Sequence, residues 1–313
     1  MLVVIALGGN ALLRRGEPLD VDTQRRNVRV AARTIAEVAA RHSVVVTHGN
    51  GPQVGLLALQ SAAYREVPPY PLDVLGAESE GMVGYIIEQE LRNCLPDREV
   101  AAVLTQVEVA PDDPAFLTPS KPIGPLYDAE TAQRLTREEG WRFASYGDGY
   151  RRVVASPEPV RLLELECIRL LVQHEVLVIC AGGGGVPVVL DDNCQTIGIE
   201  AVIDKDLSAA LLAEALAADW LLMLTDVSAV SSDWGVADAR NIRQASPPAL
   251  RRMAFEAGTM GPKIDAGCRF VERTGGQAGI GSLGDAAAIL DRHAGTVIRA
   301  GLHEVEMYAT EPA

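Results

Sequence analysis

The chain contains very little lysine. Of its 28 basic residues, three are lysine (Lys121, Lys205 and Lys263) and the other 25 are arginine. This bias suggests that arginine serves wherever either cation suffices, and that lysine is kept where a compact ammonium group on a flexible stem is needed. Charge neutralisation at a moving phosphoryl group is such a task. Chance composition would give the same count, so the motif around each lysine decides between the two.

The chain also lacks a cysteine framework and a long apolar run. Its five cysteines form no C-x-x-C pair and no zinc spacing, which suggests reduced thiols and a cytoplasmic location. No apolar run approaches the ~20 residues that span a bilayer. No cationic segment precedes the apolar stretch Leu2–Leu7, so we expect no signal peptide and no membrane partner.

Positive charge is scarce overall. The formal net charge is -14, which argues against nucleic acid as the main partner. An anionic ligand would need a locally positive cleft, built from the lysines, backbone N–H groups and helix N-termini. At 313 residues, 48% of them hydrophobic, the chain is long enough for one large α/β domain or two lobes.

Short apolar runs alternate with helical patterns along the chain. In the segment 24–41, Val28, Ala32, Ile35 and Val38 fall on one helical face. Strand–helix–strand repetition predicts a mostly parallel sheet covered by helices on both sides. The predicted buried strands are 2–7, 44–47, 101–105, 176–180 and 221–224. The other predicted helices are 52–64, 75–94, 159–173, 207–217, 247–257 and 261–274.

One stretch, residues 108–159, interrupts this alternation. It is rich in Pro, Asp and Tyr, has weak periodicity and carries Lys121. So long an insertion in a compact domain is usually functional or disordered. We interpret it as a small protruding lid subdomain, against the alternative of a surface excursion with no role. The last ~12 residues are expected to fray.

Four polar or glycine-rich segments lie at the ends of predicted strands: Leu7–Ala11, Thr47–Gln53, Cys180–Pro187 and Leu224–Val227. In open parallel sheets, ligands bind at the carboxyl ends of strands, where these segments would converge. Glycines let the backbone approach a ligand closely, and Pro52 suits the first turn of a helix whose N-terminus favours anions. The Walker A, G-x-G-x-x-G and G-x-S-x-G motifs are all missing from the sequence.

Asp204-Lys205-Asp206 precedes one of the predicted helices. Either aspartate can cap that helix, which would leave Lys205 on the surface. The alternative interpretation places Lys205 at a phosphate, with Asp206 holding the ammonium group. His48 could carry a proton, but we favour a hydrogen bond that braces its loop. No His or carboxylate cluster predicts a metal site built from protein side chains.

These motifs resemble those of carbamate kinases, members of the amino-acid kinase superfamily, over nearly the whole chain. The most specific are His48–Gly55 (HGNGPQVG) and Lys121–Pro125 (KPIGP). They separate carbamate kinases from acetylglutamate, aspartate and uridylate kinases. The chain departs from the family pattern at Thr259, Tyr150 and Gly281, where Ser, Trp and Thr are usual. None of these departures removes a phosphate-contacting residue.

The resemblance implies a three-layer αβα sandwich with a central, mostly parallel eight-stranded sheet and a protruding lid. Residues 1–200 would form an N-terminal lobe that binds the phosphoryl acceptor, carbamate, and would include the lid at 108–159. Residues 201–313 would form a C-terminal lobe that binds the adenine nucleotide. A homodimer is also implied.

The implied reaction is ATP + carbamate ⇌ ADP + carbamoyl phosphate, with Mg²⁺ carried on the nucleotide phosphates. The implied phosphate-contacting residues are Lys121, Lys205 and Lys263, with Asp206 orienting the lysines. The acceptor site would be lined by Gly8, Gly9, Asn10, Gly49, Asn50 and Gly51, to which we add Gly182 and Gly183 of the glycine run. The nucleotide would lie near Thr225, Asp226, Met260, Lys205 and Lys263.

Carbamate presents an anionic oxygen, so the reaction needs no general base and depends on charge stabilisation. Two alternatives stay open. The same fold could phosphorylate another small acid or a phosphonate antibiotic, although the tight Gly-Asn loops favour a very small acceptor. The second alternative is a regulatory protein that binds a nucleotide without turnover. The retention of all three lysines and Asp206 argues against this alternative.

Overall fold

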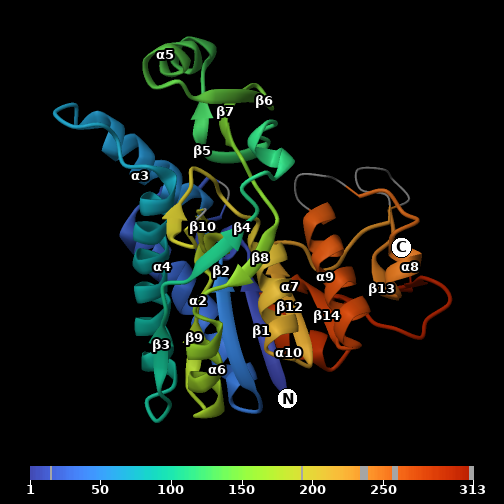
Figure 1. The fold of residues 1–313 in the computed structure, drawn as a ribbon. Coiled ribbons are helices and arrows are strands. Elements are labelled where there is room, and N and C mark those ends of the chain that lie inside the picture. Colours follow the sequence, from blue (N-terminus) through green and yellow to red (C-terminus); the bar gives the residue numbers. More distant parts are fainter. Residues whose placement is uncertain (15, 192, 233–238, 256–259, 310–313) are drawn as a thin grey trace.

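The computed structural model describes residues 1–14, 16–191, 193–232, 239–255 and 260–309. Its centre is a large sheet covered by helices on both faces (Figure 1). The strand order is β16-β13-β15-β14-β12-β1-β2-β9-β3. The strands are β1 (Leu2–Leu7), β2 (Ser43–His48), β3 (Val100–Ala102), β9 (Leu177–Ile179), β12 (Trp220–Thr225), β13 (Ile242–Ala245), β14 (Gln277–Ser282), β15 (Thr296–Ile298) and β16 (Glu306–Met307).

The sheet is mostly parallel, as predicted. Strands β3, β9, β2, β1, β12 and β14 pair in parallel, and antiparallel pairing occurs at β14–β15 and β13–β16. Its described part has nine strands, whereas the resemblance implied eight. The two-residue strand β16 lies in the terminal segment that we expected to fray. Strand β16 is held to the sheet because Met307 pairs with Ile242 and the Tyr308 hydroxyl donates to the Gly295 carbonyl (2.7 Å).

Alternate residues of the central strand β1 face different helical layers. Val3, Ile5 and Leu7 pack in one apolar cluster, and Val4 and Ala6 pack in the other. Side chains of a strand point to opposite faces in turn, so a strand buried on both faces becomes apolar throughout. The cluster with Val3, Ile5 and Leu7 includes residues of three helices: α2 (Val21–Ala39), α4 (Leu72–Cys94) and α10 (Ala286–Leu290). The cluster with Val4 and Ala6 includes residues of four helices: α6 (Leu165–Gln173), α7 (Lys205–Ala215), α8 (Pro247–Leu250) and α9 (Met260–Thr274). The three-layer prediction is confirmed.

The insertion forms an ordered lid. Strands β5 (Lys121–Tyr127), β7 (Gly149–Val154) and β6 (Arg142–Tyr146) make a three-stranded antiparallel sheet, which carries helix α5 (Ala129–Glu139). The lid stands away from the central sheet at the top of Figure 1. It meets the body at α3 (Gly51–Ala63), where a Cβ built on Gly55 would lie 2.0 Å from the Cα of Gly124.

The chain enters and leaves the lid region through a second, four-stranded sheet of order β11-β10-β4-β8. Its strands are β4 (Gln106–Val109), β8 (Pro159–Leu162), β10 (Val186–Leu190) and β11 (Thr196–Gly198). The predicted helix over 159–173 is therefore wrong at its start. Residues Pro159–Leu162 instead pair antiparallel with β4, and the helix begins only at Leu165.

Two other predicted elements end earlier in the structure than in the sequence prediction. The predicted strand 101–105 ends at Ala102, and the predicted helix 247–257 ends at Leu250, while residues 256 and 257 lie outside the described part. Strand β14 was not predicted at all. A Cβ on its Gly279 would lie 2.5 Å from a methyl carbon of Ile289, so close packing selects glycine there and interrupts the apolar run. Of the described helices, none is long and apolar enough to cross a membrane.

Candidate active site

The glycine-rich loops converge at the carboxyl ends of neighbouring strands. The N–H of Gly8, directly after β1, donates to the carbonyl of Leu224 at the end of β12 (2.8 Å). The N–H of Gly49, directly after β2, donates to the carbonyl of Leu7 (3.1 Å). A Cβ on Gly49 would lie 3.3 Å from the backbone nitrogen of Gly9. The two loops therefore touch through backbone atoms, and this contact leaves little room for a side chain.

The glycine run after β9 lies against the loop after β2. Gly182–Gly184 form a single 3-10 turn, and Gly183 has the positive φ of +69° that favours glycine. A Cβ on Gly183 would lie 2.1 Å from the amide nitrogen of Asn50. Residues Gly49–Gly51 and Gly182–Gly183, predicted to share a site, thus lie side by side. Gly9 and Asn10 begin the short helix α1 (Gly9–Leu12).

Two of the lysines share one buried carboxylate. Asp206 is 4% exposed. Its Oδ1 accepts a hydrogen bond from Lys205 Nζ (2.6 Å), and its Oδ2 accepts one from Lys263 Nζ (2.8 Å). Lys205 begins α7 and Lys263 lies in the first turn of α9, so the carboxylate fixes ammonium groups from two helices beside the glycine loops. The carbon stem of Lys205 lies close to Gly49, whose built Cβ would be 3.5 Å from Cδ.

The electrostatics of this cluster follow from burial. Burial by itself would raise the pKa of Asp206, but the ammonium groups of Lys205 and Lys263 outweigh it and hold the pKa well below its usual range. Burial lowers the pKa of Lys205, and the neighbouring Lys263 lowers it further. For Lys263, burial is outweighed by the attraction of Asp206, so its pKa is raised. Two cations and one anion leave a net positive charge that suits an anionic ligand.

The lid lysine joins the same cluster. Lys121 is the first residue of β5, and its ammonium group forms an ion pair with the Oδ2 of Asp204. Asp204 caps α7, since its Oδ1 accepts from the backbone N–H of Asp206 (2.9 Å). The three lysines thus contact one Asp-Lys-Asp segment. Sequence reasoning treated Asp204 only as a possible cap and missed its ion pair, because no local pattern reveals which carboxylate a distant lysine will contact.

His48 is fully buried at the end of β2. Its Nδ1 lies 3.1 Å from the carbonyl oxygen of Gly49, so this nitrogen carries the proton and donates to the loop. Burial lowers the pKa of His48 to about 4, so the ring is neutral at neutral pH. A Cβ on Gly182 would lie 2.4 Å from the ring. This geometry supports the bracing interpretation of His48 over the proton carrier.

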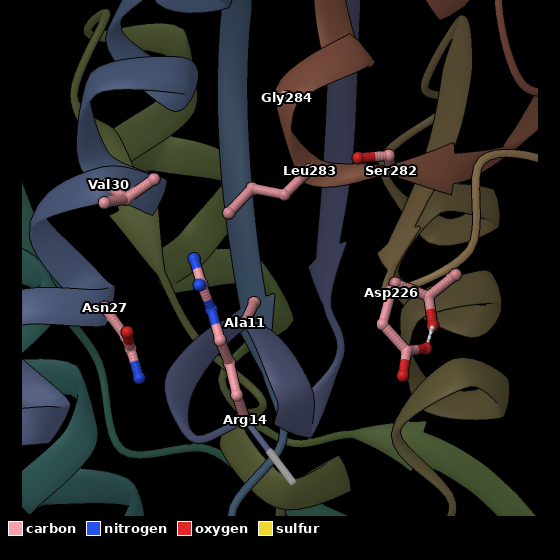
Figure 2. Close-up of a pocket in the computed structure, with 9 residues that line it drawn as sticks. Ala11, Arg14, Asn27, Val30, Asp226, Ser282, Leu283 and Gly284 are labelled. Atoms are coloured by element: carbon pink, nitrogen blue, oxygen red, sulfur yellow. Dashed lines mark hydrogen bonds between the residues drawn. The ribbon is translucent and has the colours of Figure 1, made fainter. Parts of the chain in front are cut away.

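The residues predicted to contact the nucleotide lie on two sides of the strand ends. Thr225 and Asp226, at the end of β12, line a pocket of about 400 Å³, and the Thr225 hydroxyl donates to Asp226 Oδ1 (3.1 Å). Figure 2 shows Arg14 and Asp226 on opposite sides of this pocket, with Ser282 and Leu283 between them and above. Met260 is not part of this pocket and begins α9, one turn before Lys263. Across the described residues, no group of three His, Cys, Asp or Glu side chains is arranged to hold a metal ion.

Comparisons with known proteins agree with one another. Residues 1–282 match the model of the amino acid kinase family. A carbamate kinase of Haemophilus influenzae is 52% identical over 310 residues, which cover 99% of this chain and 100% of that protein. A carbamate kinase of Rhizobium meliloti is 50% identical over 315 residues, covering 100% of this chain and 97% of that protein.

Solved structures of carbamate kinase are also similar to this chain. The structure of carbamate kinase from Giardia lamblia bound to citric acid has a TM-score of 0.89 at 39% identity, covering 95% of this chain and 98% of that one. The same Giardia enzyme bound to AMP-PNP has a TM-score of 0.87 with equal coverage. A UMP kinase from Bacillus anthracis, at 14% identity and a TM-score of 0.57, shares the fold.

Proposed function

The chain belongs to the amino acid kinase family, and we propose that it works as a phosphotransferase that interconverts ATP and carbamate with ADP and carbamoyl phosphate. Carbamate kinases match it over their full length at about half of all positions. The observation that carries the proposal is the cluster of Lys205, Asp206 and Lys263, with Lys121 on the adjoining residue Asp204. All three lysines of the chain meet at this one place.

We propose that the chain divides its substrates between two lobes. Residues 1–200 would bind carbamate through the glycine loops, with the lid at 108–159 covering them, and residues 201–313 would bind the adenine nucleotide. The close backbone approach of Gly9 and Gly49 supports a very small acceptor. The binding of AMP-PNP by the Giardia relative supports an adenine nucleotide. In this arrangement Thr225, Asp226 and Met260 contact the nucleotide.

The chemistry follows from charge. The anionic oxygen of carbamate attacks the terminal phosphorus of ATP, and the bond from that phosphorus to the bridging oxygen breaks, so that ADP leaves. During this transfer, negative charge spreads over the oxygens of the transferred group. Lys205 and Lys263 are held by one carboxylate, and each ammonium group still has N–H donors to direct at those oxygens. Lys121 would exchange Asp204 for the phosphoryl group. Groups already fixed in place stabilise such charge without reorganising during the reaction.

Mg²⁺ is proposed to enter with the nucleotide phosphates and to neutralise part of their charge. Both oxygens of Asp206 hold ammonium groups, which fits a residue that orients lysines rather than one that ligates a metal. The neutral, buried ring of His48 is likewise assigned to bracing the loop. We therefore assign no general base and no protein metal ligand to the site.

Two further properties belong to the proposal. Five free cysteines support a cytoplasmic location. The sheet edge at β3 supports a homodimer, because exposed apolar side chains beside it could pack against a second copy of the chain. Tyr85 and Leu104, next to this edge, are both 55% exposed. Light scattering of the purified protein would measure its mass in solution. The net charge of -14 supports small-molecule rather than nucleic-acid partners.

The deciding experiment mixes the purified protein with Mg²⁺, ADP and carbamoyl phosphate and follows ATP formation. Wild-type protein should form ATP, and Lys205→Ala should be slower by about 100-fold or more, the scale of losing one transition-state contact. Arg92→Ala is a suitable control, because Arg92 is partly exposed and pairs with Glu88 and Glu99, away from the strand ends. No ATP from the wild type while ADP still binds would favour another small acid as the acceptor.

A further inference from the structure

Two adjacent side chains of helix α4 each hold a different loop of the candidate acceptor site. We propose that Ser79 and Glu80 are positioning residues, which set the distance between the loop Gly49–Gly51 and the loop Gly182–Gly184 and so fix the shape of the acceptor site. The proposal rests on the proposed function for the identity of the acceptor. Neither residue belongs to a motif quoted above, and each is hydrogen-bonded to one of the two loops.

Ser79 holds the loop after β2. It is fully buried, and its hydroxyl accepts a hydrogen bond from the side-chain amide of Asn50 (2.7 Å). The same hydroxyl donates to the carbonyl of Gly76 in the preceding turn of α4 (2.8 Å). The Ser79 hydroxyl therefore donates its proton to the helix backbone and accepts a hydrogen bond from Asn50. The amide of Asn50 is thus tied to a rigid helix of 23 residues.

Glu80 holds the loop after β9. It is 4% exposed, and its Oε1 accepts from the backbone N–H of Gly182 (2.9 Å). Its other oxygen lies 3.4 Å from the backbone nitrogen of Thr105. Thr105 in turn accepts from the N–H of Ala181 through its hydroxyl (2.9 Å). The start of the glycine run is thus fixed by Glu80 directly and by Thr105 from the other side.

The two loops interlock in front of this pair. Gly183 lies against the amide of Asn50, and Gly182 lies against the ring of His48. No side chain could be added at either glycine, because its Cβ would lie 2.1 to 2.4 Å from those groups. A shift of either loop would therefore push the other. Because Ser79 and Glu80 are neighbours on one helix, they hold both loops to a common frame.

Glu80 can accept the Gly182 N–H bond as a neutral acid or as a carboxylate, and these two forms differ in charge. The titratable groups around it are His48 of β2, Cys180 after β9, Glu164 before α6, and Tyr85 and Glu88 of its own helix. Burial raises the pKa of Glu80 to about 8, so the carboxyl is neutral at pH 7. Ionisation above that pH would place a negative charge directly behind the site of an anionic acceptor.

A set of four variants tests the proposal. Ser79→Ala and Glu80→Ala remove one loop contact each, and Glu80→Gln keeps the shape of the neutral acid. Glu90→Gln is the matched control, because Glu90 lies on the same helix and is equally buried but pairs with Arg29, away from the loops.

In the ATP-forming reaction, Ser79→Ala and Glu80→Ala should raise the KM for carbamoyl phosphate by about 10-fold or more, as expected for leaving a buried polar partner unsatisfied. The KM for ADP should stay within about twofold of wild type, since the nucleotide does not depend on these loops. At pH 7, Glu80→Gln should restore the KM for carbamoyl phosphate to near the wild-type value. Equal changes in both KM values, or the same change in Glu90→Gln, would overturn the positioning role.

The pH dependence gives a second readout. The KM for carbamoyl phosphate should rise above pH 8 in wild type more than in Glu80→Gln, so the ratio of the two KM values should change across that pH. A constant ratio from pH 7 to 9 would remove the role of Glu80 ionisation.

A readout without activity separates this inference from the proposed function. Hydrogen exchange of the backbone amides in residues 181–185 should be faster in Glu80→Ala than in wild type, and unchanged in Glu90→Gln, because Glu80 accepts the Gly182 N–H bond. Faster exchange in a protein whose wild type forms no ATP would overturn the assigned acceptor and keep the loop clamp. Unchanged exchange in an active enzyme would overturn the clamp and keep the function.

Discussion

The substitution Asp206→Asn should damage both the stability and the activity of the protein. The Asp206 carboxylate is the shared partner of Lys205 and Lys263, at 2.6 and 2.8 Å. Asparagine keeps the size of the side chain but carries no charge, and it offers an acceptor at only one of the two positions that the carboxylate oxygens occupy. The other ammonium group would then face the amide NH₂, which is itself a donor.

The magnitude follows from burial. Breaking a buried ion pair by removing one partner costs about 3–5 kcal/mol, because an uncompensated charge is left behind. The side chains of Lys205 and Lys263 are only 13% and 12% exposed, so water screens them little. We expect a loss near 3 kcal/mol at pH 7 rather than the upper limit, since Lys205, whose pKa is already lowered, can release its proton. Turnover should fall by about 100-fold or more, since the ammonium groups are no longer fixed.

Urea unfolding at low salt measures the stability change, and ATP formation measures the turnover. Sulfate or ATP should recover more stability in Asp206→Asn than in wild type, because an added anion replaces the missing carboxylate. The stability difference between the two proteins should shrink below about pH 4, since the pKa of Asp206 is lowered in the folded state and its stabilisation is lost as the carboxylate is protonated.

The control is Asp265→Asn on the same helix as Lys263. Asp265 pairs with Arg251 and Arg269 at the surface, so its removal should change stability by no more than about 1 kcal/mol. A loss below about 1 kcal/mol in Asp206→Asn, together with wild-type turnover, would refute the view that this carboxylate holds the lysines for catalysis.

Three further predictions concern other parts of the molecule. Lowering the pH from 7 to 5 should destabilise wild type by about 2 kcal/mol more than His48→Gln in urea unfolding. The reason is that the pKa of His48 is lowered to about 4 in the folded state, whereas protonation of the unfolded chain begins near pH 6.5. Equal losses of stability in the two proteins would mean that the ring is not buried as described. Gly55→Ala should lower the free energy of unfolding by about 1–3 kcal/mol, measured by thermal unfolding, because the added Cβ would collide with Gly124 of the lid. The control is Gly76→Ala, whose Cβ would meet nothing within 4 Å, and this change should be neutral or stabilising. Lys121→Ala should lower kcat by about 10-fold, because it removes one charge-assisted hydrogen bond from a partly exposed group. This effect is smaller than the one expected for loss of either buried lysine. Turnover at the wild-type rate would exclude the lid lysine from catalysis.

The layered fold could be predicted because its central strands are buried on both faces. Leu2–Leu7 reads as a continuous apolar run, and the structure has a strand over that same range. The strand β14 could not be read this way. Its glycines at 279 and 281 fit against Ile289, a contact made in the folded molecule and invisible in the local sequence.

The candidate site was predictable where chemistry depends on residue type. The scarcity of lysine and the glycine loops indicated which segments would meet, and the structure brings Lys205 next to Gly49. The supporting contacts were not predictable. Glu80 lies in the middle of a long helix, where a glutamate is ordinarily exposed, and only the fold reveals that it is buried under the Gly182 turn. Pairings between distant residues, such as Lys121 with Asp204, are likewise a product of the tertiary structure.

The concentration of lysine at one place gives the protein a built-in spectroscopic label. Only three residues of the 313 carry a side-chain primary amine. Feeding isotope-labelled lysine during expression would therefore yield three ammonium signals by NMR, and each would come from the region around Asp204 and Asp206. Binding of a nucleotide or closure of the lid could be followed residue by residue in an enzyme of this size without assigning the rest of its spectrum.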